Sequence, residues 1–308
     1  MAPMADVTDR AFREMFVRHS KGCPESVPYV SYTEFVSADG LFKGGFDALE
    51  KVLIFSDSER PIVAQFFSPD PVLMGRAAKL ARERGFDGID INMGCPDANV
   101  CNQGSGAALI KNAKLARDII RATQKGAGDI PVSVKTRIGY TKDSELEEWL
   151  PELLAEEPAV VILHARTKKN MSKVPARWEN IARAVAIRDA LKSDTLIIGN
   201  GDVRSLALAR SRATETNCDG IMIGRGLFGN PWFFREGYVP SLEERLRALV
   251  EHAGLFEKLV SHKPFHIMKK HFKAYAEGFH GAKELREELM RTENSKEVAR
   301  VIERFLLL

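Results

Sequence analysis

The segment Gly88–Ile110 reads GIDINMGCPDANVCNQGSGAALI. Its first residues have the apolar pattern of a short buried strand, and from Asn92 the chain enters a loop that contains Cys95. Gly104 and Gly106 then precede an apolar stretch that is typical of a helix start. In folds that alternate strands and helices, the carboxyl ends of the strands carry the chemistry. We therefore interpret Cys95 as a reactive group at the carboxyl end of a strand.

Short runs rich in Val and Ile alternate with amphipathic helical stretches as far as about residue 236. Strands are predicted at 29–35, 61–67, 88–92, 132–137, 160–166, 195–200 and 220–224, and helices at 8–17, 71–84, 111–124, 145–154, 178–191 and 205–214. Such alternation requires parallel strands joined by crossover helices. With one more strand carrying residues 2–4, the pattern predicts a closed (β/α)8, or TIM, barrel. That first strand would lie almost wholly upstream of Met1, so we expect it to be truncated or shortened.

The pattern changes after Phe234. The remaining residues lack strand signals and show an apolar period near 3.6, for example at Leu242, Leu246 and Leu249. Ser241 and Glu244 have capping-box spacing, which indicates a helix start. We predict an α/β barrel domain at 1–238, followed by a small all-α helical domain at 239–308.

Composition excludes several classes of protein. Among 308 residues, 45 Lys and Arg face 42 acidic residues, so the net charge of +3 gives no general attraction to nucleic acid, and RNA binding would need local patches. The four cysteines, at 23, 95, 101 and 218, show neither metal-finger spacing nor a disulfide framework. We therefore expect no metal site and a reducing, cytoplasmic setting. No apolar run approaches membrane-spanning length, and nothing indicates an obligatory protein partner.

Polar residues recur at the predicted carboxyl ends of the strands: Gln65, Asn92, Lys135, Arg137, His164, Arg166, Asn200 and Arg225. A barrel of this size must end its strands in something polar, but a polar residue on nearly every strand indicates a site. Lys135 and Arg137 lie on the same side of one strand. Half-buried cations need an anion or an electron-rich ring, and a reduced flavin would satisfy Lys135. The alternative is an ion pair between Lys135 and Glu34 or Asp90.

Glycine-rich loops follow the last two predicted strands, at Gly199–Asp202 and Gly224–Gly229. In barrels of this type, such loops form a recurrent phosphate site, with backbone N–H groups directed at the anion. The second loop also spells G-x-G-x-x-G, but it has no second nucleotide-binding half behind it, which makes a Rossmann interpretation weak. The alternative is that both turns simply need glycine.

Cys95 lies after a glycine and before a proline, in a loop. A free cysteine is more often an inert buried thiol, but this position favours a functional one. Cys101 lies in the same loop and is the competing candidate, whereas Cys23 and Cys218 are interpreted as structural. A thiol with a pKa of about 8.5 is mostly protonated at neutral pH and can act as a general acid.

Two segments are basic and contain no acidic residues. Residues 158–178 carry Arg166, Lys168, Lys169, Lys173 and Arg177, and residues 258–276 carry Lys258, Lys263, Lys269, Lys270 and Lys273. Either alone is typical of a solvated surface. Together, one in each predicted domain, they indicate a phosphate backbone bound across both, through the loop 164–177 and a basic helix at 263–273.

Several motifs follow one another along almost the whole chain: residues 2–9 (APMADVTD), 33–38 (TEFVSA), 64–65 with 70–71, 92–96 (NMGCP), 104–107, 134–137 (VKTR), 164–167 (HART), 199–202 (GNGD), 224–226 with 231–232, and 270–271, 275 and 281–286 in the tail. In this order they resemble the tRNA-dihydrouridine synthase family. The resemblance implies a flavoprotein that reduces specific uridines in tRNA to 5,6-dihydrouridine, with FMN as cofactor and NADPH or NADH as electron donor.

The same resemblance implies roles for individual residues. Hydride would pass from N5 of FMN to C6 of a flipped-out uridine, and Cys95 would donate the proton to C5. Substrate-binding residues would be Asn92, Arg137 and Arg166. Cofactor-binding residues would be Pro3, Met4, Gln65, Lys135, His164, Asn200, Gly201, Asp202, Gly224 and Arg225.

The chain departs from the family pattern at two positions. Asp6 replaces the usual glycine of the opening loop, and Ser172 stands where the family usually has a tyrosine near the substrate base. The alternative functions are an FMN barrel that acts on ribosomal RNA or on a small pyrimidine, as in dihydroorotate-type dehydrogenases, and a silent RNA-binding module. The helical tail and the two basic segments argue against a small substrate.

Overall fold

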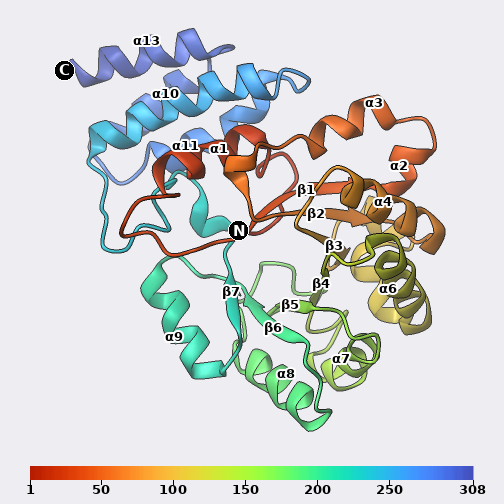
Figure 1. The fold of residues 1–308 in the computed structure, drawn as a ribbon. Helices are drawn as coiled ribbons and strands as arrows, with labels where there is room; N and C mark the ends of the chain where they lie inside the picture. The colour runs from red at the N-terminus through yellow and green to blue at the C-terminus, as the bar shows by residue number, and fades with distance from the viewer. Residues whose placement is uncertain (308) are drawn as a thin grey trace.

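Seven parallel strands form a single curled sheet in the computed structural model, which describes residues 1–307 (Figure 1). Each strand pairs with the next in the chain: β1 Ser31–Ser37, β2 Ile62–Phe67, β3 Gly88–Met93, β4 Val132–Arg137, β5 Val160–His164, β6 Leu196–Asn200 and β7 Gly220–Met222. These strands lie within about two residues of the predicted ones. The prediction of a TIM-barrel-like α/β fold is confirmed.

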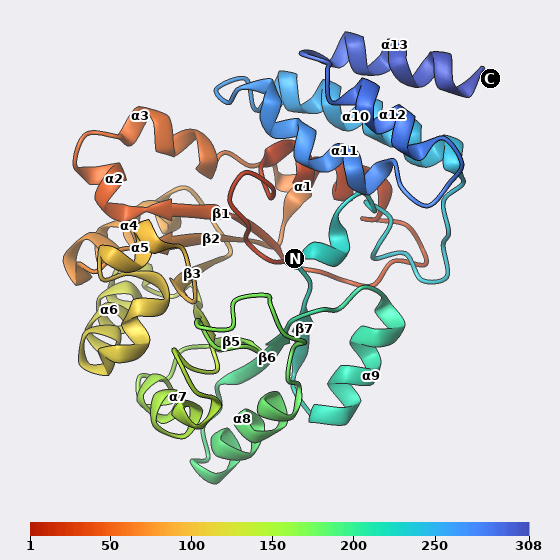
Figure 2. The same cartoon turned by 180° about the vertical axis from the view of Figure 1, so that it is seen from behind.

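Helices cover the outside of the sheet (Figures 1 and 2). The six predicted helices are present, with these observed bounds: α1 Arg10–His19, α4 Pro71–Glu83, α6 Ala113–Ala127, α7 Leu146–Leu154, α8 Glu179–Ala190 and α9 Leu206–Thr216. Their starts are fixed locally: Asp70, for example, accepts hydrogen bonds from the N–H groups of Val72 and Leu73, with Pro71 in the first turn. The prediction missed three short helices, α2 Ala38–Phe42, α3 Phe46–Leu49 and α5 Ala98–Asn102.

The first two residues fill the gap between β7 and β1. The amino group of Met1 donates to the carbonyl oxygen of Val30 (2.9 Å), just before β1. The N–H of Ala2 donates to the carbonyl oxygen of Ile223 (2.7 Å), just after β7. Ala2 also belongs to a separate buried cluster with Tyr32 and residues of β5 and β7. Among the described residues, this segment forms no strand between β7 and β1.

The helices after Ser241 form a second core. They are α10 Leu242–Leu259, α11 Lys269–Tyr275, α12 Ala282–Leu289 and α13 Ser295–Leu306. Ser241 and Glu244 form the predicted capping box. Ala11 and Met15 of α1 are buried in this core, so the helical part packs directly on the barrel, as Figure 2 shows. None of the helices in residues 1–307 is long and apolar enough to cross a bilayer.

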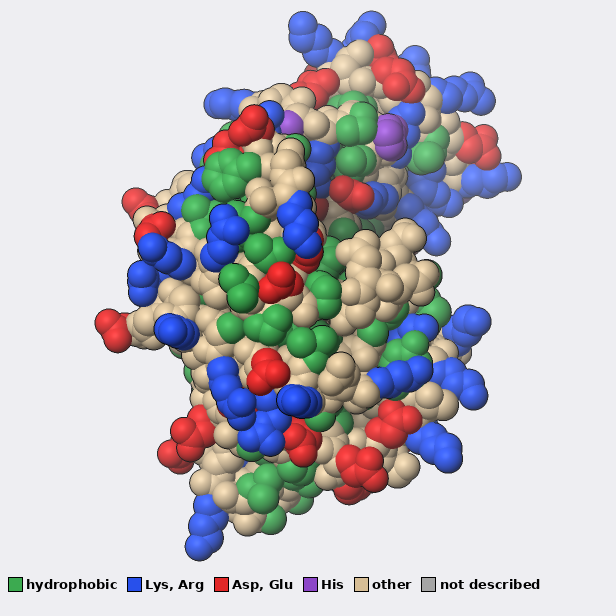
Figure 3. Space-filling view, turned by 90° about the vertical axis from the view of Figure 1, so that its right-hand side faces the viewer, with side chains coloured by type: hydrophobic (Ala, Val, Ile, Leu, Met, Phe, Trp, Pro, Cys, Tyr) green, Lys and Arg blue, Asp and Glu red, His purple; other side chains and the backbone are tan. Residues whose placement is uncertain are grey.

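The basic segment of the tail differs from the prediction. Residues 263–273 are not one helix but a turn of 3-10 helix at Phe265–Met268 followed by α11. Three of its lysines are paired with acids, because the tail folds back on the barrel and on itself: Lys263 with Glu34 and Asp6, Lys269 with Glu293, and Lys270 with Asp6. Lys258 and Lys273 are exposed. Lys and Arg side chains are spread over both the upper and the lower part of the face drawn in Figure 3.

Lys263 joins the tail to the barrel. Its Nζ lies 2.7 and 2.9 Å from the carboxylate oxygens of Glu34 on β1 and 3.0 Å from Oδ1 of Asp6. Only 6% of the Glu34 side chain is exposed. Asp6 has a φ of 54°, in the left-handed region that glycine favours, and the ion pair offsets part of the cost of an aspartate there.

Lys263→Met should lower the free energy of unfolding by about 3 kcal/mol, because it leaves the Glu34 carboxylate buried without a cation. Urea denaturation measures this change. Lys283→Met is the matched control: Lys283 lies 4.0 Å from Glu287 on an exposed surface, and its loss should cost at most about 0.5 kcal/mol. Equal effects of the two substitutions would contradict the structural role of Lys263.

Candidate active site

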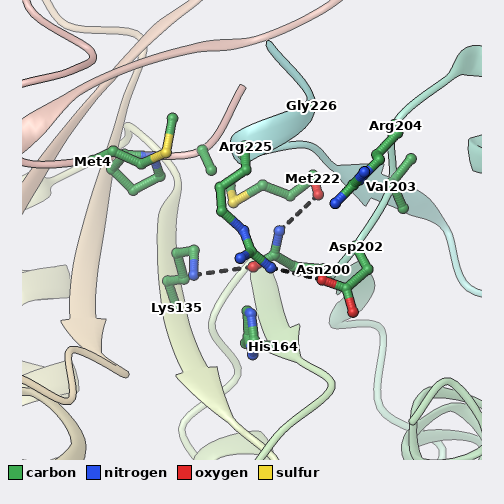
Figure 4. Close-up of a pocket in the computed structure, with 14 residues that line it drawn as sticks. Met4, Lys135, His164, Asn200, Asp202, Val203, Arg204, Met222, Arg225 and Gly226 are labelled. Carbon is green, nitrogen blue, oxygen red and sulfur yellow. Dashed lines mark hydrogen bonds and ion pairs between the residues drawn. The ribbon is translucent and has the colours of Figure 1, made fainter. Parts of the chain in front are cut away.

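A cavity of about 190 Å³ opens at the carboxyl ends of the strands (Figure 4). It is lined by strand ends, by the opening loop and by the two glycine-rich loops: Ala2, Pro3, Met4, Lys135, His164, Asn200, Gly201, Asp202, Val203, Arg204, Met222, Gly224, Arg225 and Gly226. All the residues predicted to bind a cofactor lie here except Gln65. The structure thus brings together residues from both ends of the predicted barrel domain.

The prediction missed Ala2, Val203, Arg204, Met222 and Gly226 among the lining residues. Arg204 matters most, because it places a second exposed cation beside Arg225 (Figure 4). Its signal in the sequence is its position two residues after the GNGD motif, at the approach to α9. No periodic pattern marks it.

The glycine-rich loops need their glycines. Gly201 has a φ of 139°, and a Cβ on Gly226 would lie 2.4 Å from the carbonyl oxygen of Val203. The two loops therefore approach each other more closely than side chains would permit. The two interpretations of these glycines, turns that need glycine and a phosphate site, are therefore compatible. Close approach of the backbone also exposes N–H groups to an anion.

Lys135 projects from β4 into the cavity. Its Nζ lies 3.4 Å from Oδ1 of Asn200, which is fixed by donating from Nδ2 to the carbonyl oxygen of Met222 (2.7 Å). Burial and the nearby Arg137 lower the pKa of Lys135 to about 8. Within residues 1–307 Lys135 forms no ion pair with Glu34 or Asp90. The charge of Asp90 on the neighbouring strand partly offsets this lowering of the Lys135 pKa, but Asp90 makes no direct contact with the ammonium group.

His164 ends β5 on the floor of the cavity. Burial, and then the positive charges of Arg137 and Lys135, lower its pKa well below the ordinary value, so the imidazole is neutral at pH 7. Nη1 of Arg137 lies 3.5 Å from Nδ1 of His164. Because arginine can only donate, this contact assigns the imidazole proton to Nε2. His164 thus offers a donor at Nε2.

Arg137 links the Cys95 loop to the loop after β5. Its Nε donates to the carbonyl oxygen of Gly94 (2.7 Å), and Nη1 lies 3.3 Å from that of Thr167 and 3.4 Å from that of Met171. Burial lowers its pKa to about 10, so it remains charged at pH 7. Arg137 therefore holds two loops in place at the mouth of the barrel.

Arg166 and Asp202 fix the shape of the basic loop 164–177. Arg166 is 2% exposed, donates from Nε to the carbonyl oxygen of Val174 (2.5 Å) and forms an ion pair with Asp202. Asp202 also accepts from the N–H of Ala176 (3.0 Å) and from Arg225 (2.7 Å). Nη1 of Arg166 is buried and has no partner within residues 1–307. These contacts place Arg166 inside the loop and leave Lys169 and Lys173 exposed on its surface.

The Cys95 loop is held from below by Asn92. Oδ1 of Asn92 accepts hydrogen bonds from the N–H groups of Gly94 (3.1 Å) and Cys95 (2.9 Å). The thiol of Cys101 is directed at the carbonyl oxygen of Cys95 (3.4 Å). A Cβ on Gly106 would lie 2.9 Å from the same oxygen, so the return of the chain requires glycine there. Both candidate thiols thus lie against backbone: the thiol of Cys101 donates to the carbonyl oxygen of Cys95, and that of Cys95 lies at the N–H of Asp97.

The thiol of Cys95 should react slowly with iodoacetamide at neutral pH. Burial raises its pKa above that of an ordinary cysteine, so the reactive thiolate forms only at higher pH. We expect the pH profile of its alkylation, followed by peptide mass spectrometry, to have a midpoint above the value of about 8.5 of free cysteine. A midpoint below that of glutathione in the same samples would contradict this assignment.

Comparison with known proteins agrees with this geometry. The family model described as dihydrouridine synthase (Dus) matches residues 1–307. A probable tRNA-dihydrouridine synthase of Staphylococcus epidermidis and probable tRNA-dihydrouridine synthase 2 of Bacillus subtilis are each 38% identical over 99% of this chain, covering 92% and 93% of those proteins.

Solved structures show the fold alone. An amine oxidase of Pseudomonas geniculata that acts on 6-hydroxypseudooxynicotine matches 75% of this chain and 45% of its own, with a TM-score of 0.55 and 12% identity. The family model and the relatives, in contrast, cover the whole described chain and its motifs. The chain therefore belongs to the dihydrouridine synthase family.

Proposed function

We propose that this protein reduces uridines in tRNA to 5,6-dihydrouridine, with FMN as cofactor and NADPH or NADH as electron donor. One observation carries the proposal: a thiol that stays protonated at neutral pH lies on the same rim as a glycine-lined, cationic cavity. The names of the relatives, which are probable tRNA-dihydrouridine synthases, support the substrate. The four free cysteines agree with a reducing, cytoplasmic setting.

The cavity residues fit FMN. Arg204 and Arg225 beside the glycine-rich loops would hold its phosphate, and Lys135, which contacts Asn200, would face the electron-rich part of its ring. Nε2 of His164 would donate to a ring or ribityl oxygen. Asp202 lines the cavity, but its carboxylate would repel a phosphate, so we assign it to orienting Arg166 and Arg225. When bound, FMN supplies the hydride that C6 of the uracil receives.

The loop after β3 would act on the substrate. Cys95 holds a proton at neutral pH and would donate it to C5 of the uracil, as a general acid. Both lone pairs of Oδ1 of Asn92 are occupied by backbone N–H groups, and one of its two amide hydrogens by Gln65. Asn92 therefore has one free donor, which suits a uracil carbonyl oxygen. Arg137 would position this loop and the loop 164–177 around the base.

The RNA would bind through local positive patches, since the net charge is only +3. On the barrel these are the exposed Lys169 and Lys173, and on the helical tail Lys258 and Lys273. Figure 3 shows cationic side chains over both parts. The paired Lys263, Lys269 and Lys270 would instead hold the tail in position, so only part of the predicted basic segment is available to RNA.

The function is tested under anaerobic conditions. The purified protein should bind FMN, NADPH should reduce the flavin, and unmodified tRNA should reoxidise it. Cys95→Ala should slow reoxidation by tRNA about 10²- to 10⁴-fold, the usual contribution of a general acid, while reduction by NADPH continues. Stopped-flow absorbance measures both steps.

Cys23→Ala is the control for cysteine removal, and Cys101→Ala tests the competing thiol; both should retain tRNA-dependent reoxidation. A reduced flavin that no tRNA reoxidises, but that ribosomal RNA or a small pyrimidine does, would replace the proposed substrate. A protein that binds tRNA without taking up FMN would overturn the proposal of an enzyme.

The phosphate site is tested by comparing FMN with riboflavin, which lacks the phosphate. Arg204→Met should weaken FMN binding about five- to tenfold, because a partly exposed charge-assisted hydrogen bond is lost. Riboflavin binding should not change. Fluorescence quenching on titration gives both affinities, and Arg210→Met, an exposed arginine on α9 paired with Glu236, is the control. Equal losses for the two flavins would contradict a phosphate contact.

A further inference from the structure

A chain of buried side chains runs from the barrel interior to the Cys95 loop. Nε2 of Gln65 donates to Oδ2 of Asp90 (2.5 Å), and Nδ2 of Asn92 donates to Oε1 of Gln65 (3.0 Å). Asn92 then accepts the N–H groups of Gly94 and Cys95. Asp90 and Gln65 have no exposed surface. The chain therefore connects a fully buried carboxylate to the backbone of the proposed acid.

We propose that Asp90 is a positioning residue, whose acceptor oxygen fixes the direction of the Gln65 and Asn92 amides and thereby holds Cys95 in place. The proposal rests on the proposed function, because Cys95 is the group that it positions. Asp90 itself touches neither the cavity nor the loop.

The direction of these hydrogen bonds is set at the backbone end. Backbone N–H groups can only donate, so Asn92 must turn its oxygen to them and its nitrogen to Gln65. Gln65 must then present its oxygen to Asn92, which leaves its nitrogen facing residue 90. The chain can end only on an acceptor. Asp90 meets this requirement.

The surroundings of Asp90 favour this role. Ser133 on the neighbouring β4 donates to Oδ1 of Asp90, so each carboxylate oxygen receives one hydrogen bond. Burial raises the pKa of Asp90 to about 6, while the hydrogen bonds from Gln65 and Ser133 and the charge of Lys135 favour the ionised, acceptor-only carboxylate. A buried amide donor without an acceptor would be costly, and the whole chain would have to rearrange.

This arrangement also explains why Gln65 lies outside the cavity lining. Both ends of its amide are occupied, one by Asp90 and one by Asn92. Its predicted contact with a cofactor would therefore be limited to its second amide hydrogen and the second lone pair of Oε1. We assign Gln65 to the connection between Asp90 and the Cys95 loop.

The test measures the alkylation of Cys95 by iodoacetamide in the full-length protein at a fixed pH, with peptide fragmentation distinguishing Cys95 from Cys101. Asp90→Leu keeps a similar volume but removes the acceptor, and Gln65→Met interrupts the chain at the next link. Each should raise the alkylation rate about tenfold, because the unpaired amides loosen the loop. The double variant should be no faster than Gln65→Met alone.

Asp90→Asn is the matched variant that should restore the parent rate. Its carbonyl oxygen can accept from Gln65, its amide can donate to Ser133, and the Ser133 hydroxyl can turn to the carbonyl oxygen of Ile89, 3.4 Å away. An Asp90→Asn rate as fast as that of Asp90→Leu, or parental rates in Gln65→Met, would overturn the proposal. Because labelling needs no FMN, NADPH or RNA, its result is independent of the success of the proposed function.

Discussion

The site depends on all strands of the barrel running in one direction. Because each strand pairs in parallel with the next, every carboxyl end reaches the same rim. The register then sets neighbours: Asn92 pairs with Lys135, Arg137 with His164, and His164 with Asn200. Residues far apart in the sequence thus form one row of polar groups along the mouth. The cavity, the cationic side chains and the thiol all follow from this arrangement.

The need to pair the backbone N–H and carbonyl groups with hydrogen-bond partners explains the shape of the Cys95 loop. When β3 ends, its backbone N–H groups lose their strand partners and must find others. Asn92 supplies the acceptor, and its own amide needs Gln65, which in turn needs Asp90. On the opposite side, Arg137 takes up the carbonyl oxygen of Gly94. The Gly94-Cys95-Pro96 segment is therefore held from two sides without burying the thiol completely.

The sequence predicted the strands and the longer helices well, because apolar period, capping residues and glycines are local signals. It also predicted most of the cavity, since residues at strand ends must converge in a parallel barrel. It did not predict the helices α2, α3 and α5, which are too short to show a period. Nor did it predict that Lys263 would pair with Glu34, 229 residues away, because such contacts follow only from the docking of the tail.

The tail and the opening loop are coupled through that docking. Lys263 and Lys270 hold Asp6, two residues after Met4 in the cavity lining. Asp6, whose left-handed backbone conformation favours glycine, is thus matched by cations on the helical part, within the residues that the structure describes. The tail, whose exposed lysines we propose to bind RNA, is in this way fixed relative to the proposed cofactor site.

The most direct measurement is nucleoside mass spectrometry of unmodified tRNA after incubation with the purified protein, FMN and NADPH. The account predicts that the parent protein forms a nucleoside heavier than uridine by two hydrogen atoms. Cys95→Ala should form much less of it in the same time. Unchanged uridine in every tRNA, from a protein shown to bind reduced FMN, would contradict the central claim.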